Sequence, residues 1–555
     1  MTQLLDGGVE AAAGLAVYGT DAIDRTLPAS TRAALIADEV PRRLSEKDPT
    51  LWGPAAQDEA RIRLGWVDTF RRSRDLLPQL AQLKDELGDL DHVVLAGMGG
   101  SSLAPEVIAR TLGAPLTVLD TTDPGQVRAA LNDRLDRTVV VISSKSGTTV
   151  ETDSHRRVYW QAFLDSGLSK AEAGRRFVIV TDPGSPLAAT GEEMGALVVL
   201  ADPDVGGRYS ALTAFGLVPS ALAGVEVAEL IEQAEALAPA LGRDRDNPGL
   251  ALGAALGAAA TAGRDKIALI SDGTGIEGLG DWIEQLIAES TGKDGLGLLP
   301  VVVETPESPG TTGADVLTVT TGGMLAPGVV PGGGVQPDLA VNGPLGAQFL
   351  AWEYATAVAG IVLGIDPFNQ PNVTESKDNT NQLLTAGLPV ETPLFTEDAI
   401  EVYAPAGTAS DLVGALRWLL DRVGDTGYLA VMAYLDRGGD AAAAQLRPLL
   451  AAATSALPAG ERPVTFGWGP RFLHSTGQYH KGGPQLGAYL QITGAVDRDL
   501  PVPGRPYTFG ELQAAQAAGD RQALIGRERP LLRLHLADRA PGIRQLVAAA
   551  RVLAG

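Results

Sequence analysis

The sequence predicts an α/β protein built mainly of parallel, doubly wound sheets. From about residue 91 onward, short apolar runs rich in β-branched residues alternate with helical segments, which is typical of parallel sheets covered by helices on both faces. Before that point, apolar residues recur at helical spacing. The 555 residues are enough for about two to four domains. The 45% hydrophobic and 20% charged content is ordinary for a soluble globular protein.

The order of the expected elements divides the chain into four regions. Residues 1–88 are expected to form an N-terminal helical segment, and residues 395–555 a C-terminal α/β extension. Residues 89–243 and 244–394 have the same alternation and could be two copies of one nucleotide-binding-like fold. The expected strands are 92–96, 116–119, 138–142, 177–180, 197–200, 266–271, 298–303, 316–319, 400–403, 428–434, 464–468, 486–492 and 531–536.

Composition excludes several classes of function. A net charge of −23 and the lack of a long Lys/Arg run argue against nucleic-acid binding, so an anionic substrate needs locally placed cations. Without cysteine there is no disulfide, thiolate catalysis or cysteine-based metal site. The N-terminus lacks the features of a signal peptide, and the apolar segment 250–263 is too short to cross a bilayer. A cytoplasmic protein without membrane association is therefore expected.

The most informative segment is a hydroxyl-rich loop. Six hydroxyl side chains lie within ten residues around Gly147, directly after the expected strand 138–142. The segment reads Ser143-Ser144-Lys145-Ser146-Gly147-Thr148-Thr149-Val150-Glu151-Thr152. A loop at the carboxyl end of a parallel strand, leading into a helix, is a common anion site. A Ser/Thr-rich surface turn with a helix cap is the alternative.

A glycine-rich loop follows the expected strand 92–96. It reads Gly97-Met98-Gly99-Gly100-Ser101-Ser102, and glycine lets backbone N–H groups approach a ligand. The loop half-matches a dinucleotide fingerprint, and Asp120 lies about where a ribose-binding acid would be. A Rossmann dehydrogenase is therefore an alternative, but such an enzyme does not require the second, hydroxyl-lined loop.

An arginine and a glutamate follow in separate motifs. Gly206-Gly207-Arg208-Tyr209-Ser210 presents an arginine on a tight loop, where its fork suits an oxyanion or phosphate. Glu289 lies at the end of an expected amphipathic helix, in Gln285-Leu286-Ile287-Ala288-Glu289-Ser290-Thr291-Gly292-Lys293. A carboxylate can act there as a base that takes a proton from carbon. An ordinary loop salt bridge and a solvated helix-end acid are the alternatives.

Two later segments carry further polar candidates. Gln370 and Lys377 follow a long apolar helix over 345–363, although surface lysines are common. His474 and His480 are two of only five histidines and share a Gly-rich loop. Histidine is a natural proton shuttle near neutral pH. Without further ligands the pair does not predict a metal site, and neither a metal nor an organic cofactor is expected.

Together, the five motifs up to Lys377 resemble the phosphoglucose isomerase family. The segments 97–101 and 144–152 are similar to the family's first Gly-Gly-Ser loop and its phosphate loop, with Gly147 in place of a usual aromatic residue. Segments 206–210, 285–293 and 370–377 resemble those with the catalytic Arg, the catalytic base, and a substrate-contacting Gln and Lys. The resemblance implies two sugar-isomerase (SIS-type) domains, over 89–243 and 244–394.

Two departures from the family pattern stand out. The family usually has a histidine between the base and the Gln/Lys segment, whereas here the histidine loop lies about a hundred residues after Lys377. The long extension after residue 395 resembles the isomerase half of transaldolase–phosphoglucose isomerase fusions. Only about 90 residues precede Gly97, whereas a transaldolase barrel needs about 250. Isomerase activity without transaldolase activity is therefore expected.

The resemblance implies reversible isomerisation of glucose 6-phosphate and fructose 6-phosphate through an enediolate, a step of glycolysis and gluconeogenesis. Glu289 is implied as the base, Arg208 as the group that offsets the enediolate charge, and Gln370 as an orienting group. His474, His480 or Lys377 would open the sugar ring. The implied phosphate-binding residues are Ser101, Ser144, Lys145, Ser146, Thr148 and Thr149.

Other functions and partners remain open at this point. One alternative is a dual phosphoglucose/phosphomannose isomerase, and another is a non-catalytic sugar-phosphate sensor. A small sugar phosphate is the expected partner. A homodimer is possible, because the family commonly pairs subunits around the site.

Overall fold

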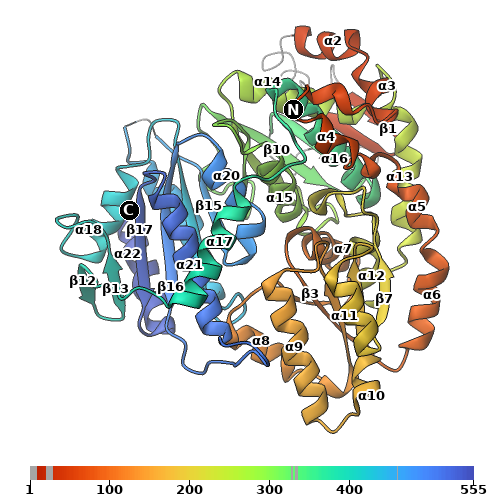
Figure 1. Ribbon diagram of the computed structural model, residues 1–555. Helices are drawn as coiled ribbons and strands as arrows, with labels where there is room; N and C mark the ends of the chain where they lie inside the picture. The colour runs from red at the N-terminus through yellow and green to blue at the C-terminus, as the bar shows by residue number, and fades with distance from the viewer. Residues whose placement is uncertain (1–8, 20–28, 327–328, 330, 332–335, 459) are drawn as a thin grey trace.

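The computed structural model describes residues 9–19, 29–326, 329, 331, 336–458 and 460–555. Within these residues the chain forms one five-stranded and two six-stranded sheets, with mostly parallel strand pairs (Figure 1). Helices cover the faces of the sheets. The predicted α/β class with parallel sheets is confirmed.

The first sheet is parallel throughout and has the strand order β4-β3-β5-β6-β7. Because β3 lies between β4 and β5, the strand order reverses at the β3–β5 pair, where Gly97 and Ser143 face each other at the carboxyl ends. Ligands of open α/β sheets bind at such a switch point. The strands are β3 (His92–Gly97), β4 (Thr117–Leu119), β5 (Thr138–Ser143), β6 (Phe177–Thr181) and β7 (Leu197–Leu200).

The second sheet has the order β1-β2-β11-β10-β8-β9, and β8 to β11 are parallel. Its parallel part repeats the pattern of the first sheet, since β8 lies between β9 and β10. The chain's first two strands form a hairpin that joins the edge antiparallel to β11. The strands are β1 (Val9–Ala12), β2 (Leu15–Tyr18), β8 (Lys266–Ser271), β9 (Leu299–Val302), β10 (Val316–Gly322) and β11 (Leu339–Asn342).

This hairpin corrects the expectation that residues 1–88 are helical. Alternation over four residues per strand is too short a signal to stand out in the sequence, and the pairing partner lies more than three hundred residues away. Helices do make up most of the remainder. They are α2 (Ala29–Ala37), α3 (Val40–Ser45), α4 (Gln57–Arg61), α5 (Thr69–Arg74) and α6 (Leu77–Glu86).

The third sheet lies in the C-terminal region and has the order β12-β13-β17-β16-β14-β15. Strands β14 to β17 are parallel, and β13 runs antiparallel both to β17 and to the edge strand β12. The strands are β12 (Phe395–Glu397), β13 (Ile400–Tyr403), β14 (Tyr428–Tyr434), β15 (Val464–Trp468), β16 (Gly487–Gly494) and β17 (Leu531–Leu536).

The remaining α-helices lie between and after the strands. In the first region they are α7 (Leu103–Thr111), α8 (Pro124–Leu131), α9 (Val150–Asp165), α10 (Lys170–Gly174), α11 (Pro186–Met194), α12 (Ala214–Leu222) and α13 (Ala228–Leu241). The second region holds α14 (Pro248–Thr261), α15 (Leu279–Thr291), α16 (Leu345–Leu363) and α17 (Val373–Ala386). The third holds α18 (Leu412–Leu420), α19 (Leu446–Thr454), α20 (Gly477–Gly482), α21 (Phe509–Ile525) and α22 (Arg539–Ala554).

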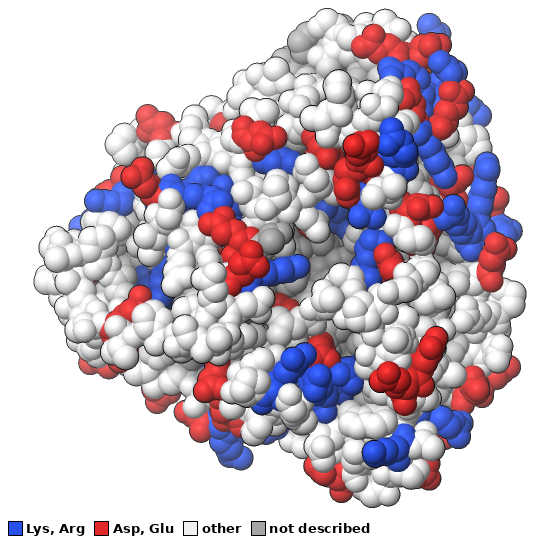
Figure 2. Space-filling model, in the orientation of Figure 1, with Lys and Arg blue, Asp and Glu red and all other residues white. Residues whose placement is uncertain are grey.

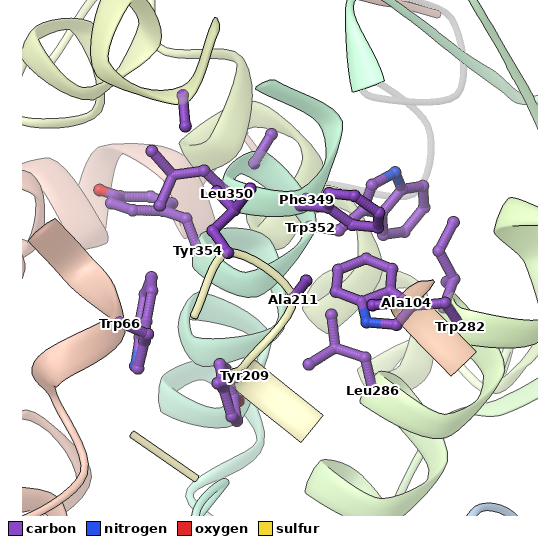
Figure 3. Packing of buried hydrophobic residues seen from close by; sticks show 14 of the residues in the cluster. Trp66, Ala104, Tyr209, Ala211, Trp282, Leu286, Phe349, Leu350, Trp352 and Tyr354 are labelled. Atoms are coloured by element: carbon purple, nitrogen blue, oxygen red, sulfur yellow. The ribbon is translucent and has the colours of Figure 1, made fainter. Parts of the chain in front are cut away.

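Helix α16 forms the centre of the largest hydrophobic core, where Trp352 and Phe349 are fully buried (Figure 3). Phe349 meets Trp282 of α15 edge to face at 4.8 Å. Gly253 lets α14 approach closely, because a Cβ there would lie 2.6 Å from the backbone oxygen of Ala355. Among the described residues, α16 alone is long and apolar enough to cross a membrane, and 89% of its most apolar window is buried inside the protein. It is therefore a core helix here.

The C-terminal region lies against both other sheet-containing regions (Figure 1). Several of its arginines pair with acidic residues of the other regions. Among these pairs are Arg437 with Glu106, Arg471 with Glu106, Asp120 and Asp281, and Arg539 with Asp123. We propose the boundaries 1–88, 89–243, 244–394 and 395–555 for the domains. The β1–β2 hairpin then belongs structurally to the second sheet.

Candidate active site

A cavity of about 590 Å³ opens beside the carboxyl ends of β3 and β5. Figure 2 shows a hollow near the centre of this face, with Lys and Arg side chains at its rim. Ten of the twelve predicted site residues line the cavity: Ser101, Ser144, Lys145, Ser146, Thr149, Arg208, Glu289, Gln370, Lys377 and His474. Segments far apart in the sequence therefore meet at one place.

The hydroxyl-rich loop forms one wall. Ser144 Oγ lies 2.9 Å from Thr149 Oγ1 and accepts from the Gly147 N–H at 3.2 Å, which closes the loop into a compact turn. Gly147 has a φ of +69°, and a Cβ there would lie 2.9 Å from Leu187. Its lack of a side chain therefore suits a turn packed against α11, and Gly147 is not among the lining residues.

Thr148 lies apart from the other residues of the predicted phosphate set. Its hydroxyl lies 3.0 Å from Ser146 Oγ, and the residue does not line the main cavity. It lines a neighbouring space of about 320 Å³ instead, together with residues of α17. Neighbouring positions of a turn face different ways, which spacing alone does not resolve.

The glycine loop brings the arginine loop close. Gly100 approaches Gly207 so tightly that a Cβ would lie 1.9 Å from the Gly207 oxygen. Gly99 has a φ of +55°, and a Cβ there would lie 2.6 Å from Gln285 Nε2. Both positions therefore require glycine, and they bring Ser101 to the same cavity as Arg208.

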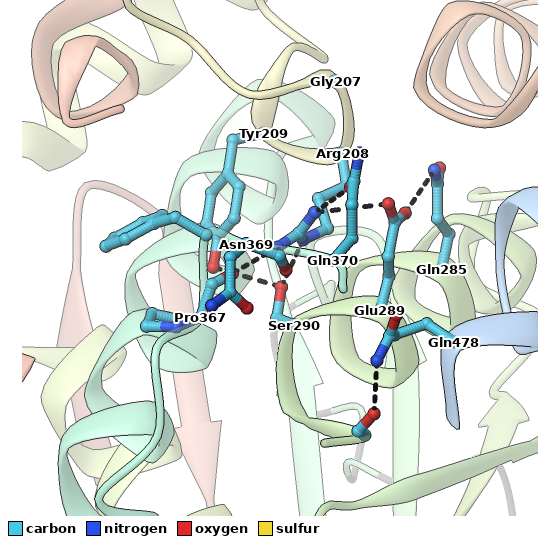
Figure 4. Close-up of polar contacts among 12 residues, drawn as sticks. Gly207, Arg208, Tyr209, Gln285, Glu289, Ser290, Pro367, Asn369, Gln370 and Gln478 are labelled. Carbon is cyan, nitrogen blue, oxygen red and sulfur yellow. Dashed lines mark hydrogen bonds and ion pairs between the residues drawn. The ribbon is translucent and has the colours of Figure 1, made fainter. Parts of the chain in front are cut away.

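Arg208 is held by a dense set of contacts (Figure 4). Its Nε donates to Ser290 Oγ at 2.8 Å, and its Nη1 donates to Gln370 Oε1 at 2.9 Å and Glu289 Oε1 at 3.3 Å. Its Nη2 donates to the backbone oxygens of Pro367 and Asn369 at 2.6 and 3.1 Å. With the side chain 3% exposed, the guanidinium is a fixed positive charge beside the carboxylate.

Glu289 lies in the last turn of α15 with both carboxylate oxygens engaged. Oε1 faces Arg208, and Oε2 accepts from Gln285 Nε2 at 3.0 Å. Gln285 lies one helical turn earlier, where residues four apart share a face. These contacts point the carboxylate into the cavity, which both residues line.

Lys293 stabilises the turn before Gln370 through hydrogen bonds to its backbone. Its ammonium donates to the backbone oxygen of Asp366 at 2.5 Å. It also donates to the backbone oxygen of Asn369 at 2.6 Å and to Asn369 Oδ1 at 2.9 Å. Burial and the charge of Arg208 lower the pKa of Lys293 to about 7, against the attraction of Asp366 and Glu289. Lys293 thus fixes the turn that carries Gln370.

His474 comes from the C-terminal region, at the end of the short 3₁₀ helix Arg471–His474. Its Nε2 lies 3.0 Å from Glu151 Oε1 at the start of α9. Burial raises the pKa of Glu151, but the neighbouring His474 ring and its hydrogen bond outweigh burial, so the pKa lies below its usual range. An ionised carboxylate therefore faces a cavity-lining imidazole.

His480 also lies apart from the other predicted site residues. It is 2% exposed and packs among the rings of Tyr428, Phe472 and Tyr489, and it does not line the cavity. Neither ring nitrogen has a hydrogen-bond partner within the described part of the chain. Burial and the charges of Lys481 and Arg529 hold the pKa of His480 well below its usual range. A buried neutral ring of this kind contributes to packing.

The structure adds cavity residues that the sequence reasoning missed. Glu59 and Arg63 come from α4 and the loop after it, and Asp182 follows β6. Lys145 Nζ donates to Asp182 Oδ2 at 2.5 Å, and burial raises the pKa of Asp182. Asp182 follows a predicted strand, and that position could have identified it as a candidate. Glu59 and Arg63 have no comparable feature in the sequence.

Comparison with known proteins agrees with these motifs. Residues 83–294 match the family model of phosphoglucose isomerase. That region holds the glycine loop, the hydroxyl-rich loop, Arg208 and Glu289. The predicted family is thereby confirmed.

Individual relatives differ in how much of the chain they cover. A probable glucose-6-phosphate isomerase from Haloarcula marismortui is 36% identical over 222 residues, which is 39% of this chain and 50% of the relative. The chain thus spans about half the length of that relative. A glucose-6-phosphate isomerase from Symbiobacterium thermophilum is 28% identical over 389 residues, or 58% of this chain and 86% of the relative.

Solved structures support the fold. A glucose-6-phosphate isomerase from Chlamydia trachomatis superposes with a TM-score of 0.54 at 18% identity, covering 70% of this chain and 92% of that chain. A hypothetical protein from Thermus thermophilus has a TM-score of 0.55 at 22% identity, covering 65% of this chain and 98% of that chain.

Proposed function

We propose that the protein catalyses the reversible isomerisation of glucose 6-phosphate and fructose 6-phosphate. The observation that carries this proposal is the pairing of Arg208 with Glu289 in a cavity that the hydroxyl-rich loop also lines. A phosphate loop alone suits any sugar-phosphate binder. A carboxylate beside a fixed guanidinium adds a base and a stabilising charge, which a proton transfer between neighbouring carbons needs.

The phosphate anchors the substrate at one end of the cavity. Ser101, Ser144, Ser146 and Thr149 offer hydroxyl groups, and Lys145 offers an ammonium close by. Binding energy from this non-reacting group holds the C1–C2 bond near the base. Thr148 has no part in this set.

The arrangement supports the following chemical steps. An acid opens the ring, and the His474 imidazole with its Glu151 partner suits this better than Lys377, because its geometry is fixed. Glu289 takes the proton from C2 and returns it to C1, while the hydroxyl proton moves from O2 to O1. Arg208 offsets the negative charge on the enediolate oxygens, and Gln370 orients the sugar hydroxyls.

Wider features belong to the same proposal. The enzyme acts in the cytoplasm, in glycolysis and gluconeogenesis, on a small sugar phosphate and without a metal or organic cofactor. A homodimer is proposed only by analogy with the family. Gly147, which stands where the family usually has an aromatic residue, lies against Leu187 and does not line the cavity. A dual activity with mannose 6-phosphate therefore has no supporting observation.

One coupled assay tests the proposal. Purified protein is incubated with fructose 6-phosphate in EDTA, and glucose 6-phosphate is detected by an added dehydrogenase; mannose 6-phosphate is tested in parallel. We expect turnover of fructose 6-phosphate that Glu289→Gln abolishes, which excludes a contaminating isomerase. Tight sugar-phosphate binding without turnover would instead support the sensor alternative.

A further inference from the structure

One glutamine of helix α21, in the C-terminal region, contacts two residues of the first region. Gln516 is 3% exposed, and its Nε2 donates to Glu151 Oε1 at 2.7 Å. Its own oxygen accepts from Thr122 Oγ1 at 2.7 Å. Thr122 and Glu151 belong to the first region, so this contact crosses the junction between regions.

The orientation of this amide follows from its partners. Glu151 carries a carboxylate that only accepts, and it must therefore meet the N–H side of the amide. The amide oxygen then faces Thr122, which can donate. A flipped amide would set its oxygen against an ionised carboxylate in a buried place, which is unfavourable. Gln516 thus presents a defined donor to Glu151.

The same carboxylate oxygen faces the histidine of the site. Glu151 Oε1 lies 2.7 Å from Gln516 Nε2 and 3.0 Å from His474 Nε2. A carboxylate on a two-carbon stem can rotate, and a second hydrogen bond from a fixed donor restricts that rotation. Both Gln516 and His474 come from the C-terminal region, so this region makes two hydrogen-bond contacts to Glu151 Oε1.

We propose that Gln516 is a positioning residue that holds Glu151 in line with His474 for opening of the sugar ring. The inference rests on the proposed isomerase function and extends it. It assigns the C-terminal region a part in proton transfer, beyond supplying His474. Gln516 does not touch the substrate in this proposal; it acts through Glu151.

The test compares two glutamines of the same helix. Gln516→Met keeps the side-chain length and removes the donor. Gln513→Met is the matched control, because Gln513 lies one turn earlier, is 4% exposed and lines a separate small cavity. Both variants are made in the full chain, and their melting temperatures are measured first.

Each variant is assayed with two substrates. Glucose 6-phosphate must be ring-opened, whereas a four-carbon aldose 4-phosphate cannot close a ring, because its O4 carries the phosphate. We expect Gln516→Met to lower kcat/KM by about 10-fold or more for glucose 6-phosphate and to change it little for the open-chain compound. Gln513→Met should leave both values unchanged. Equal losses on both substrates, or no loss in a folded variant, would overturn the proposal.

A second readout separates this inference from the proposed function. The imidazole resonance of His474, in protein labelled at histidine carbon ε1 and assigned with His474→Asn, should shift in Gln516→Met but not in Gln513→Met. If the wild-type protein isomerises no sugar phosphate, the proposed function fails while this measurement still reports the positioning. An unshifted resonance in Gln516→Met overturns the positioning role itself.

Discussion

Arg208 Nη1 lies 3.3 Å from Glu289 Oε1, and both side chains are almost fully buried. The two residues lie 81 positions apart, on the loop after β7 and on α15. Arg208 uses its other donors on Ser290, Gln370 and two backbone oxygens. The pair is therefore a preorganised unit, in which the proposed base and its neighbouring cation are held in place by contacts within the protein.

Replacing the base tests the centre of this unit. Glu289→Gln keeps the size of the side chain and its contact with Gln285, but it removes the group that accepts a proton from carbon. We expect kcat to fall by about 10³-fold or more, with KM changed by less than about 10-fold. Steady-state kinetics and the melting temperature check this. Near-wild-type turnover by the folded variant would remove Glu289 from the base role.

The arginine's shape is as testable as its charge. Arg208→Lys keeps a cation but cannot supply the planar fork that reaches five partners. We expect kcat to fall by about 10²-fold or more and the melting temperature to drop, because buried oxygens lose their donors. Retained activity in this variant would mean that charge alone suffices.

Two histidines were candidates for ring opening, and the structure separates them. His474→Asn should lower the rate of isomerisation far more for glucose 6-phosphate than for a four-carbon open-chain aldose phosphate, because only glucose 6-phosphate needs ring opening. His480→Leu replaces a buried ring without hydrogen-bond partners in the described structure, so it should leave the ratio of the two rates unchanged. A selective loss of glucose 6-phosphate turnover in His480→Leu, and not in His474→Asn, would instead assign ring opening to His480.

Adjacent threonines test the phosphate anchor. Thr149 lines both the cavity and the neighbouring space, whereas Thr148 lines only the neighbouring space and contacts Ser146. Thr149→Val should raise the KM for sugar phosphates by about 5-fold or more, since one hydrogen bond to a charged group is lost. Thr148→Val, its matched control, should change KM much less. Equal effects in the two variants would contradict the assignment.

Glu284, a partly buried acid outside this cavity, gives a test of how stability depends on pH. Burial, with the nearby Asp281, raises the pKa of Glu284 to about 8 from 4.5, and Ser475 Oγ donates to it at 2.9 Å. Between pH 4.5 and 8 the unfolded chain releases this proton and the folded one keeps it. Glu284 therefore lowers the free energy of unfolding progressively as pH rises through this range.

Glu284→Gln removes this pH dependence and still offers an oxygen to Ser475. We expect the variant to match the wild-type protein near pH 4.5 and to be more stable by about 1–3 kcal/mol above pH 8. Denaturant unfolding at pH 5, 7 and 9 measures the difference. A stability gap that does not grow with pH would show that Glu284 is ionised in the folded protein.

Much of the site was predictable because its chemistry is local. The hydroxyl-rich loop, the glycine loop and the loop of Arg208 each follow a recognisable strand, and the carboxyl ends of neighbouring parallel strands meet at one edge. The helix position of Glu289 follows from apolar periodicity. Each of these signals is contained within about ten residues of sequence, so a local pattern reveals it.

Other features depend on contacts between distant segments. The β1–β2 hairpin exists through pairing with β11, and the choice of His474 over His480 follows from which ring is sealed among aromatic side chains. Thr148 and Thr149 are alike in sequence and differ only in where the turn points them. The chain's local patterns thus predicted the α/β class, the match of residues 83–294 to the phosphoglucose isomerase family model and most of the residues that line the cavity. Long-range packing set which of those groups share a cavity, because burial and orientation depend on neighbours that no local pattern contains.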